Sequence, residues 1–367
     1  MKVSMFVDKP LPSERPTGIG VAAFNMALAL SRREITVRYV CRGGKDGAFS
    51  WNDHLTIQTI ANYSRGNLGA ARNLLRNEEF DVVHVHSSAA LPSLILARAL
   101  GKAVVMHSHG DEPLHPIRLA LMRKVGMSLS QRVIAASNSN RDELIRNQRL
   151  SPGKISVVYN GVSTEAFKPS GGSAYVRPRY GLEVGGKIIF SIGTVQGRKG
   201  QSKIIQCLPE ILQRWPNLTY VNVGRAYDPS YQDRLIKEAE RLGVARRIRL
   251  LEEVPQDDLV ALINSADVCV HAALREGFGL AVVEEMACGR PVVTFDIPTM
   301  AEIIESDVDG IRVQPNNRED LTKSILKLLE DPHLSRKLGD AARAKVIAKF
   351  TWDRAASRLE ALYGELL

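Results

Sequence analysis

The sequence predicts an α/β protein built from two doubly wound, mostly parallel sheets. Short runs rich in valine and isoleucine alternate with helix-length segments along the whole chain, which is typical of βαβ units. This alternation is interrupted once, near residue 170, by a stretch rich in Pro, Gly and Ser. The 367 residues, 44% of them hydrophobic, suffice for two cores. We therefore expect two domains facing a central cleft, each with ligand loops at the carboxyl ends of its strands.

Six apolar runs are the clearest predicted strands, three on each side of the interruption. They are Asp81–Val85, Lys102–Met106, Gln131–Ala135, Lys187–Ser191, Ser265–Val270 and Arg290–Thr294. The linker candidate begins with Lys168–Ser173 and ends at Gly185-Gly186. We therefore expect an N-terminal domain over residues 1–168, a linker over 169–186 and a C-terminal domain over 187–349.

The end of the chain reads as one amphipathic helix over residues 350–367. Its apolar residues recur at helical spacing: Trp352, Ala356, Leu359, Tyr363 and Leu366. Because these residues follow the last unit of the C-terminal domain, we expect this helix to pack back across the N-terminal domain.

The net charge of +9 is concentrated in the first half of the chain. Residues 1–165 hold 21 Lys and Arg against 13 Asp and Glu, whereas the rest is nearly balanced. Such a field suits nucleic acid, anionic lipid or an acidic acceptor, and nucleic acid is the least favoured because its recognition motifs are missing. The segment Pro116–Val125 fits a basic helix at the edge of an anionic membrane and equally an ordinary solvated helix.

The four cysteines, Cys41, Cys207, Cys269 and Cys288, lie far apart without a CxxC pair. This spacing indicates neither a disulfide framework nor a zinc site. The N-terminal apolar run is too short for a signal peptide, and no stretch approaches the length of a membrane span. We therefore expect a cytoplasmic protein.

The most informative motif is the segment from Glu276 to Glu284, in which seven residues separate two carboxylates. It follows a short apolar strand and leads into a helix. Glycines let the backbone approach a ligand, and the N–H groups of a new helix attract phosphate. Glu276 could accept hydrogen bonds from sugar hydroxyls, and Glu284, about two turns later, could reach a ribose.

Two glycine-containing loops precede helices and are candidate phosphate sites. Gly18 and Gly20 follow the first strand and could cradle a phosphate or let an acceptor approach, although the full dinucleotide fingerprint is missing. In the second half, Arg198 and Lys199 lie between Gly197 and Gly200. Two adjacent cations there would neutralise a departing diphosphate without a metal, whereas a solvated loop is the simpler alternative.

Histidine pairs and an Asp-x-Asp segment raise the question of a metal. His84 and His86, and likewise His107 and His109, share one face of a strand, but no carboxylate or cysteine has complementary spacing, so we expect no metal. We expect His109, at a strand end, to point into the cleft and His84 to be a core residue. Asp307–Asp309 reads as a turn because glycine follows.

Taken together, these motifs resemble the retaining glycosyltransferases of family 4, which have two Rossmann-like domains (the GT-B fold). The resemblance covers nearly the whole chain. It is carried by Gly18–Gly20, Asp81–His86, His109-Gly110, Lys154–Val162, Arg198–Gly200, Glu276–Glu284, Ala287–Val293 and Phe350–Trp352.

The resemblance implies a role for each matching residue. Arg198 and Lys199 would bind the donor diphosphate, Glu276 the hydroxyls of the donor sugar, and Glu284 the ribose. His109 would contact the sugar from the other domain. Further donor contacts would come from Gly18, Gly20, Thr194, Phe278, Gly279 and Leu280. Thr194 departs from the pattern, because many relatives have arginine there.

The resemblance thus implies a metal-independent, retaining transfer of a hexose from a nucleotide diphosphate sugar, with UDP preferred over GDP. The acceptor would be a hydroxyl of a glycan or lipid-linked molecule, as in bacterial surface polysaccharide and lipopolysaccharide synthesis, with possible peripheral contact to an anionic membrane. Two alternatives stay open: a nucleotide-sugar epimerase of similar build, and a catalytically silent sugar-nucleotide-binding partner of another transferase.

Overall fold

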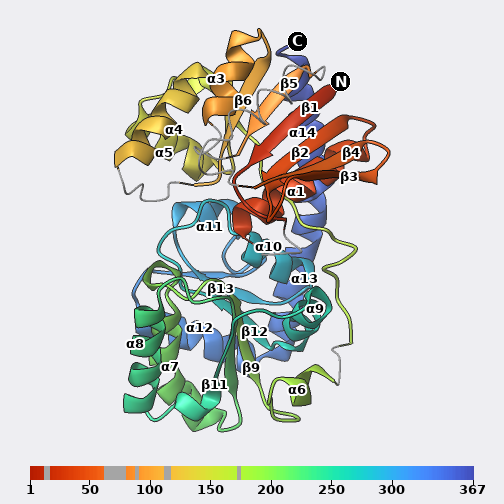
Figure 1. Cartoon of the computed structure of the whole chain (residues 1–367). Helices are drawn as coiled ribbons and strands as arrows, with labels where there is room; N and C mark the ends of the chain where they lie inside the picture. The colour runs from red at the N-terminus through yellow and green to blue at the C-terminus, as the bar shows by residue number, and fades with distance from the viewer. Residues whose placement is uncertain (12–16, 62–79, 87–90, 111–116, 172–174) are drawn as a thin grey trace. The chain divides into compact units, whose positions relative to one another are not determined.

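A computed structural model describes residues 1–11, 17–61, 80–86, 91–110, 117–171 and 175–367 (Figure 1). The chain divides into two compact units. The first contains Met1–Gly161 and Trp352–Leu367, and the second contains Val162–Thr351. The end of the chain therefore returns to the unit in which the chain begins.

The first unit is built on an eight-stranded sheet with the order β3-β4-β2-β1-β5-β6-β7-β8. Its strands are β1 (Lys2–Val7), β2 (Thr36–Arg42), β3 (Gly47–Asn52), β4 (Leu55–Ile60), β5 (Val82–Val85), β6 (Ala103–Ser108), β7 (Arg132–Ala135) and β8 (Ile155–Val157). Neighbouring strands are parallel except for the edge pair β3 and β4. The order reverses between β1 and β5, which is the signature of a doubly wound sheet.

The described helices of the first unit include one from the end of the chain. They are α1 (Gly18–Ser31), α3 (Leu91–Ala99), α4 (Ile117–Leu129), α5 (Asn138–Gln148), the 3-10 turn η3 (Pro152–Lys154) and α14 (Trp352–Gly364). Helix α14 lies beside α1, as Figure 1 shows. Arg33, just beyond α1, forms ion pairs with Glu360 at 2.6 Å and Asp353 at 3.3 Å.

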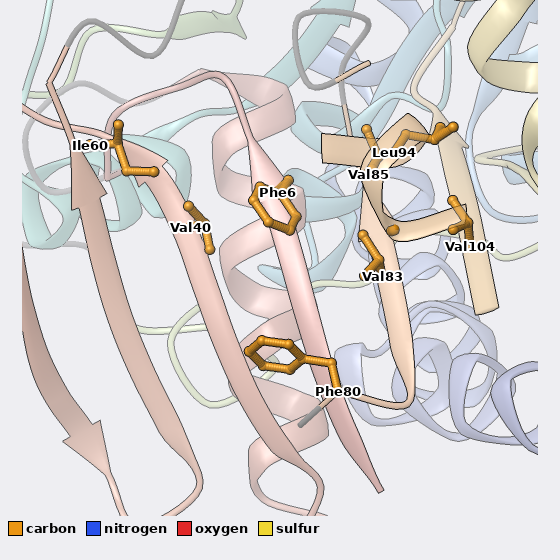
Figure 2. Packing of buried hydrophobic residues seen from close by; sticks show 9 residues of the cluster. Phe6, Val40, Ile60, Phe80, Val83, Val85, Leu94 and Val104 are labelled. Atoms are coloured by element: carbon orange, nitrogen blue, oxygen red, sulfur yellow. The ribbon is translucent and has the colours of Figure 1, made fainter. Parts of the chain in front are cut away.

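The alternation of side chains along β5 divides the core of this unit between the two faces of the sheet. On one face, Val83 and Val85 pack with Phe6 and Val104 against Leu94 of α3 (Figure 2). On the other face β5 contributes Val82 and His84, which is fully buried against Tyr363 of α14, and His86 follows directly after the strand. The first face of β5 is thus apolar, whereas the second carries imidazoles.

The second unit has a six-stranded parallel sheet with the order β11-β10-β9-β12-β13-β14. Its strands are β9 (Ile188–Ile192), β10 (Thr219–Val223), β11 (Ile248–Leu251), β12 (Val268–His271), β13 (Val292–Phe295) and β14 (Ile311–Val313). Its helices are α6 (Val176–Arg179), η4 (Gly197–Lys199), α7 (Gln201–Arg214), α8 (Pro229–Arg241), η5 (Ala245–Arg247), α9 (Gln256–Ser265), α10 (Leu280–Ala287), α11 (Pro298–Ile303), α12 (Arg318–Glu330) and α13 (Pro332–Lys349).

The predicted fold class is confirmed, since both units are α/β with parallel sheets, and each of the six predicted runs contains or overlaps a strand. The C-terminal segment forms α14, and its face of Trp352, Ala356, Leu359 and Tyr363 is buried. Within the expected linker, Gly172 and Ser173 lie outside the described residues, and the part beyond them includes α6.

Asp307–Asp309 is a turn, as expected: the N–H of Asp307 donates to the carbonyl of Gly310, and Asp309 is buried in an ion pair with Lys345 at 2.7 Å.

The predicted basic helix lies within α4, although Pro116 and the side chains of residues 117–119 fall outside the described residues. Arg123 is buried and donates to Ser108 Oγ and the carbonyl of Gly110, so the interpretation of this segment as a solvated face is wrong for that residue. No described helix combines the length and the apolar character needed to cross a membrane.

Candidate functional site

The strand order of the second unit brings two loops to one edge of its sheet. The order reverses between β9 and β12, and the loops that follow these two strands cover residues 193–200 and 272–279. Ligands of doubly wound sheets bind at such a reversal, beyond the carboxyl ends of the strands. The two loops contain most of the residues that the sequence singled out, so this edge is the candidate site.

The two loops pass so close together that only glycine fits at their contact. Gly200 has a φ of 73°, and a Cβ built there would lie 1.9 Å from the carbonyl oxygen of Ala272. The N–H of Leu274 donates to the carbonyl of Arg198 at 3.0 Å. This contact fixes the loop that carries Arg198 and Lys199 against the loop that carries Glu276.

Lys199 and Glu276 form an ion pair between the two loops. Lys199 Nζ lies 2.5 Å from Glu276 Oε1, and the side chains are only 19% and 15% exposed. Burial alone would raise the pKa of Glu276, but the charge and hydrogen bond of Lys199, helped by Arg198 and His271, outweigh it and hold this pKa below its usual range. Glu276 is therefore a carboxylate at neutral pH.

Thr194, Gly197 and Arg198 are the exposed members of the first loop. Arg198 Nη1 donates to the carbonyl of Arg275 at 3.3 Å, which extends the contact between the loops. The hydroxyl of Thr194 accepts from Gln196 Nε2 at 2.6 Å, and its carbonyl accepts from Gln201 Nε2 at 3.0 Å. The guanidinium of Arg198 and the hydroxyl of Thr194 thus lie at the surface of the loop, and the hydrogen bond from Gln201 holds the backbone of the loop in place.

Helix α10 begins where the second loop ends. Its N-cap is Gly279, with a φ of 99°, and among the described residues no side chain caps the first turn. Leu280 starts the helix, while the ring of Phe278 is buried edge-on against Phe350, with ring centroids 5.7 Å apart. An uncapped helix N-terminus that follows a loop in contact with Arg198 and Lys199 is a candidate site for a phosphate group.

Glu284 lies on the same helix, just over one turn from its start. Burial, helped by the negative charge of Glu285, raises the pKa of Glu284 to about 8. The carboxyl is therefore mostly protonated at neutral pH, and it can donate as well as accept a hydrogen bond.

The remaining predicted residues, Gly18, Gly20 and His109, belong to the first unit. Gly18 begins α1 and is exposed, and the N–H of Gly20 donates to the Thr17 hydroxyl at 3.1 Å. His109 directly follows β6, and its Nε2 lies 2.9 Å from His86 Nδ1. Burial, with a contribution from Arg123, lowers the pKa of His109 to about 4, so its ring is neutral at pH 7.

Comparison with known families matches each half of the chain. Residues 16–166 match the model described as Glycosyltransferase Family 4, and residues 176–345 match that of Glycosyl transferases group 1. A D-inositol 3-phosphate glycosyltransferase of Frankia alni is 30% identical over 296 residues, covering 76% of this chain and 72% of the relative. The chain belongs to the family 4 glycosyltransferases. A protein of the same description from Streptomyces bingchenggensis is 28% identical over 91% of this chain and 76% of its own length.

Solved structures confirm the GT-B fold of this glycosyltransferase. HepE of Anabaena, solved in complex with UDP and glucose, superimposes with a TM-score of 0.82 over the full length of both chains at 21% identity. A sucrose-phosphate synthase from Thermosynechococcus elongatus gives the same TM-score at 18% identity, covering 100% of this chain and 98% of its own. At such identities the likeness concerns the fold.

The structure adds residues to the candidate site of the glycosyltransferase that the sequence did not indicate. The Thr299 hydroxyl donates to the carbonyl of Glu276 at 2.8 Å. His271 Nε2, at the end of β12, lies 2.6 Å from Oε2 of Glu285, which is fully buried in α10. This pair joins the strand before the second loop to the helix after it. The sequence did contain a signal for Glu285, namely the two adjacent carboxylates Glu284 and Glu285. Adjacent residues of a helix point in different directions, so these two side chains cannot both have the same surroundings.

Proposed function

We propose that this glycosyltransferase moves a hexose from a UDP-sugar to a hydroxyl of a glycan or lipid-linked acceptor, with retention of configuration and without a metal ion. The single observation that carries this proposal is the Lys199–Glu276 pair at the strand-order reversal of the second unit, beside the uncapped start of α10. The cation and the helix start suit the negative diphosphate, and the carboxylate suits the hydroxyls of the sugar.

The diphosphate would bind to Lys199, Arg198 and the first N–H groups of α10. When phosphate oxygens approach Lys199, they would compete with Glu276 for the ammonium group, which has three donors. Glu276 would then accept hydrogen bonds from the hydroxyls of the sugar. Lys199 and Glu276 would thus hold each other in position before the donor binds. Once it is bound, Lys199 would contact the diphosphate and Glu276 the sugar.

Departure of the nucleotide leaves new negative charge on the diphosphate oxygens. Fixed cations and helix N–H groups stabilise such developing charge most effectively, because they need no reorganisation. Since Lys199, Arg198 and the helix start supply this positive charge, the leaving group would need no divalent ion.

Retention follows in this proposal from attack on the side of the leaving group. A retaining glycosidase uses one carboxylate as nucleophile and a second as acid and base. Here Glu276 is engaged with Lys199, and Glu284 is mostly protonated at neutral pH. The departing phosphate oxygen would therefore take the proton of the acceptor hydroxyl, and no side chain would attack the sugar.

The names of similar proteins support the donor and bear on the acceptor. HepE was solved with UDP and with UDP-glucose, and the relatives of Frankia and Streptomyces are named for D-inositol 3-phosphate. The positive surplus of residues 1–165 suits an anionic acceptor. A phosphorylated glycan or lipid-linked sugar of a bacterial surface polysaccharide fits this charge, as would a peripheral contact with anionic lipid.

A thermal-shift screen of the purified chain against UDP, GDP, ADP and their hexose conjugates tests the donor. A nucleotide at roughly 100 times its Kd should stabilise the folded state by about 2.7 kcal/mol, and we expect UDP compounds to do so. The anomeric signal in the NMR spectrum of the product then reports retention or inversion.

Three outcomes would contradict parts of the proposal. A shift with GDP compounds alone would overturn the UDP donor, and an inverted product would overturn retention. A rate that rises with added Mg²⁺ or Mn²⁺ would overturn the metal-free transfer. Conversion of the nucleotide sugar without any acceptor would indicate an epimerase, and binding without turnover a silent partner.

A further inference from the structure

Four histidines gather on one face of the sheet in the first unit. His84 and His86 belong to β5 and its end, and His107 and His109 to β6 and its end. Val85 is paired with Met106, so His86 and His107 are the next residues along these two neighbouring strands. The ring centroids of His84, His86 and His107 lie 4.2 to 5.4 Å apart, and the His107 and His109 rings stack at 4.3 Å.

The inner three imidazoles are buried without enough hydrogen-bond partners. His84, His86 and His107 are each at most 2% exposed. Among the described residues, Nε2 of His84, Nε2 of His86 and both ring nitrogens of His107 have no partner. Each buried polar group left without a hydrogen bond costs about 1–3 kcal/mol. Four such atoms in one cluster indicate that a bound species satisfies them.

The hydrogen bonds that do exist leave the free nitrogens in a suitable state to bind a metal. His84 Nδ1 lies 2.6 Å from the hydroxyl of Tyr363, and His86 Nδ1 lies 2.9 Å from His109 Nε2. If each Nδ1 carries the proton, each Nε2 keeps an unused lone pair. Metal-binding histidines are held in this way, with one nitrogen donating to a fixed acceptor and the other on the ion.

We propose that His84, His86 and His107 bind a late first-row transition-metal ion, with Zn²⁺ as the reference case. One ligand nitrogen from each residue can be chosen so that all three lie within 4.8 Å of one another. A tetrahedral ion with bonds of about 2.0–2.1 Å brings its ligands to roughly 3.4 Å apart. The three rings stack with interplanar angles of 3° to 29°, so binding of the ion requires them to turn until their lone pairs meet at one point, with the fourth position left for solvent.

The chemistry of the ligands selects the ion. Neutral imidazole suits zinc, copper and nickel, whereas magnesium and calcium prefer oxygen. Burial lowers the pKa of His84 to about 3 and those of His86 and His107 well below the usual value, so no proton competes at pH 7. Because three neutral ligands leave the charge of the ion uncompensated, we expect weaker binding than at a cysteine site.

The ligands of this proposed site belong to the first unit, whereas Lys199 and Glu276 belong to the second. The consequence of this site would concern His109, whose ring is hydrogen-bonded to His86 and stacked on His107. An ion that fixes those two rings would fix the orientation of His109 as well.

Metal uptake by untagged, full-length protein tests the proposal. After removal of metals with a chelator, equilibrium dialysis against Zn²⁺ should load one ion per chain, and the melting temperature should rise; Mg²⁺ should do neither. His107→Leu should load none. The matched control is His333→Gln, because His333 is an exposed histidine outside the cluster, and this variant should still load one ion.

The variant is chosen so that it should fold. Replacing a buried group that lacks partners by an apolar one is often neutral or stabilising, so metal-free His107→Leu should melt no lower than the metal-free wild type. If it nevertheless fails to fold, Co²⁺ in the wild-type protein decides: visible bands of a tetrahedral ion support the site, and their absence overturns it. Equal Zn²⁺ uptake by wild type and His107→Leu would also overturn it.

Discussion

At the carboxyl ends of their central strands, the two units arrange polar groups in opposite ways. The first unit stacks neutral imidazoles, with His84 and His107 deep in the core. The second unit places the charged pair of Lys199 and Glu276 between two loops, still partly open to solvent. The charged pair lies where the strand order of its sheet reverses, between β9 and β12, whereas the histidines lie on β5 and β6, next to the reversal between β1 and β5. The topology therefore sets where a site forms, and the residue types decide whether it carries charge.

The two units should consequently respond to acid in different directions, and this is the largest effect we expect. The pKa values of His84 and His109 are lowered to about 3 and about 4, and those of His86 and His107 fall well below the usual value. The unfolded chain takes up protons near pH 6.5 whereas the folded unit does not, so stability is complete above this pH and falls below it. Below pH 6.5, each fully buried histidine lowers the free energy of unfolding by about 1.4 kcal/mol per pH unit.

Hydrogen exchange measured by mass spectrometry at pH 7 and pH 5, on metal-free protein and corrected for intrinsic rates, checks this. Peptides from β5 and β6 should lose protection at pH 5. Peptides from β12 and α10 should keep their protection. Because the pKa of Glu284 is raised to about 8, this residue lowers the stability of the fold as the pH rises above 4.5, and the stability recovers on acidification. Equal loss of protection in both units would contradict the comparison.

A substitution at Lys199 tests the charged edge. Lys199→Ala should lower kcat by about 10²–10³, since a fixed group that stabilises developing charge contributes about this much, and should change KM far less. Steady-state kinetics with a saturating acceptor measure both quantities.

The matched control for Lys199→Ala is Lys323→Ala. Lys323 is an exposed lysine, paired with Glu319 on the surface of α12, and its removal should leave kcat unchanged. If kcat of folded Lys199→Ala stays within about a factor of two of the wild type, the cation has no role in the transfer step.

A smaller effect is expected from the contact between the two loops of the candidate site. Gly200→Ala and Gly185→Ala both place a side chain at a positive φ, of 73° and 77°, but only at Gly200 does the new Cβ meet backbone. Both should lose about 1–2 kcal/mol from the left-handed backbone, and Gly200→Ala about 1–3 kcal/mol more from the clash. Urea denaturation of the two variants measures the difference, and equal losses would show that the loops adjust freely.

Several elements could be predicted because their signal is local. The runs that became β5, β6, β7, β9, β12 and β13 were recognisable from continuous apolar residues. Helix α14 was recognisable from the spacing of Trp352, Ala356 and Leu359. The candidate donor residues were recognisable from glycines and charges next to a strand end. In each case, neighbouring residues contain the information.

Other features could not be predicted because they join distant residues. Lys199 and Glu276 are 77 positions apart, and their ion pair depends on the adjacency of β9 and β12. The histidine pairs were visible in the sequence, where we expected no metal because no carboxylate or cysteine has complementary spacing, but it was not visible that the two pairs lie together. The register of β5 against β6 brings them together.

The sequence by itself thus determined the class of fold, most of the central strands and the candidate residues for binding a sugar diphosphate, because hydrophobic periodicity and loop chemistry are properties of short segments. The tertiary structure decided which of these residues meet. It closed the Lys199–Glu276 pair, excluded any side chain at Gly200 and stacked the histidines in a buried core. Strand order and register produce these contacts, and both depend on how the whole sheet packs.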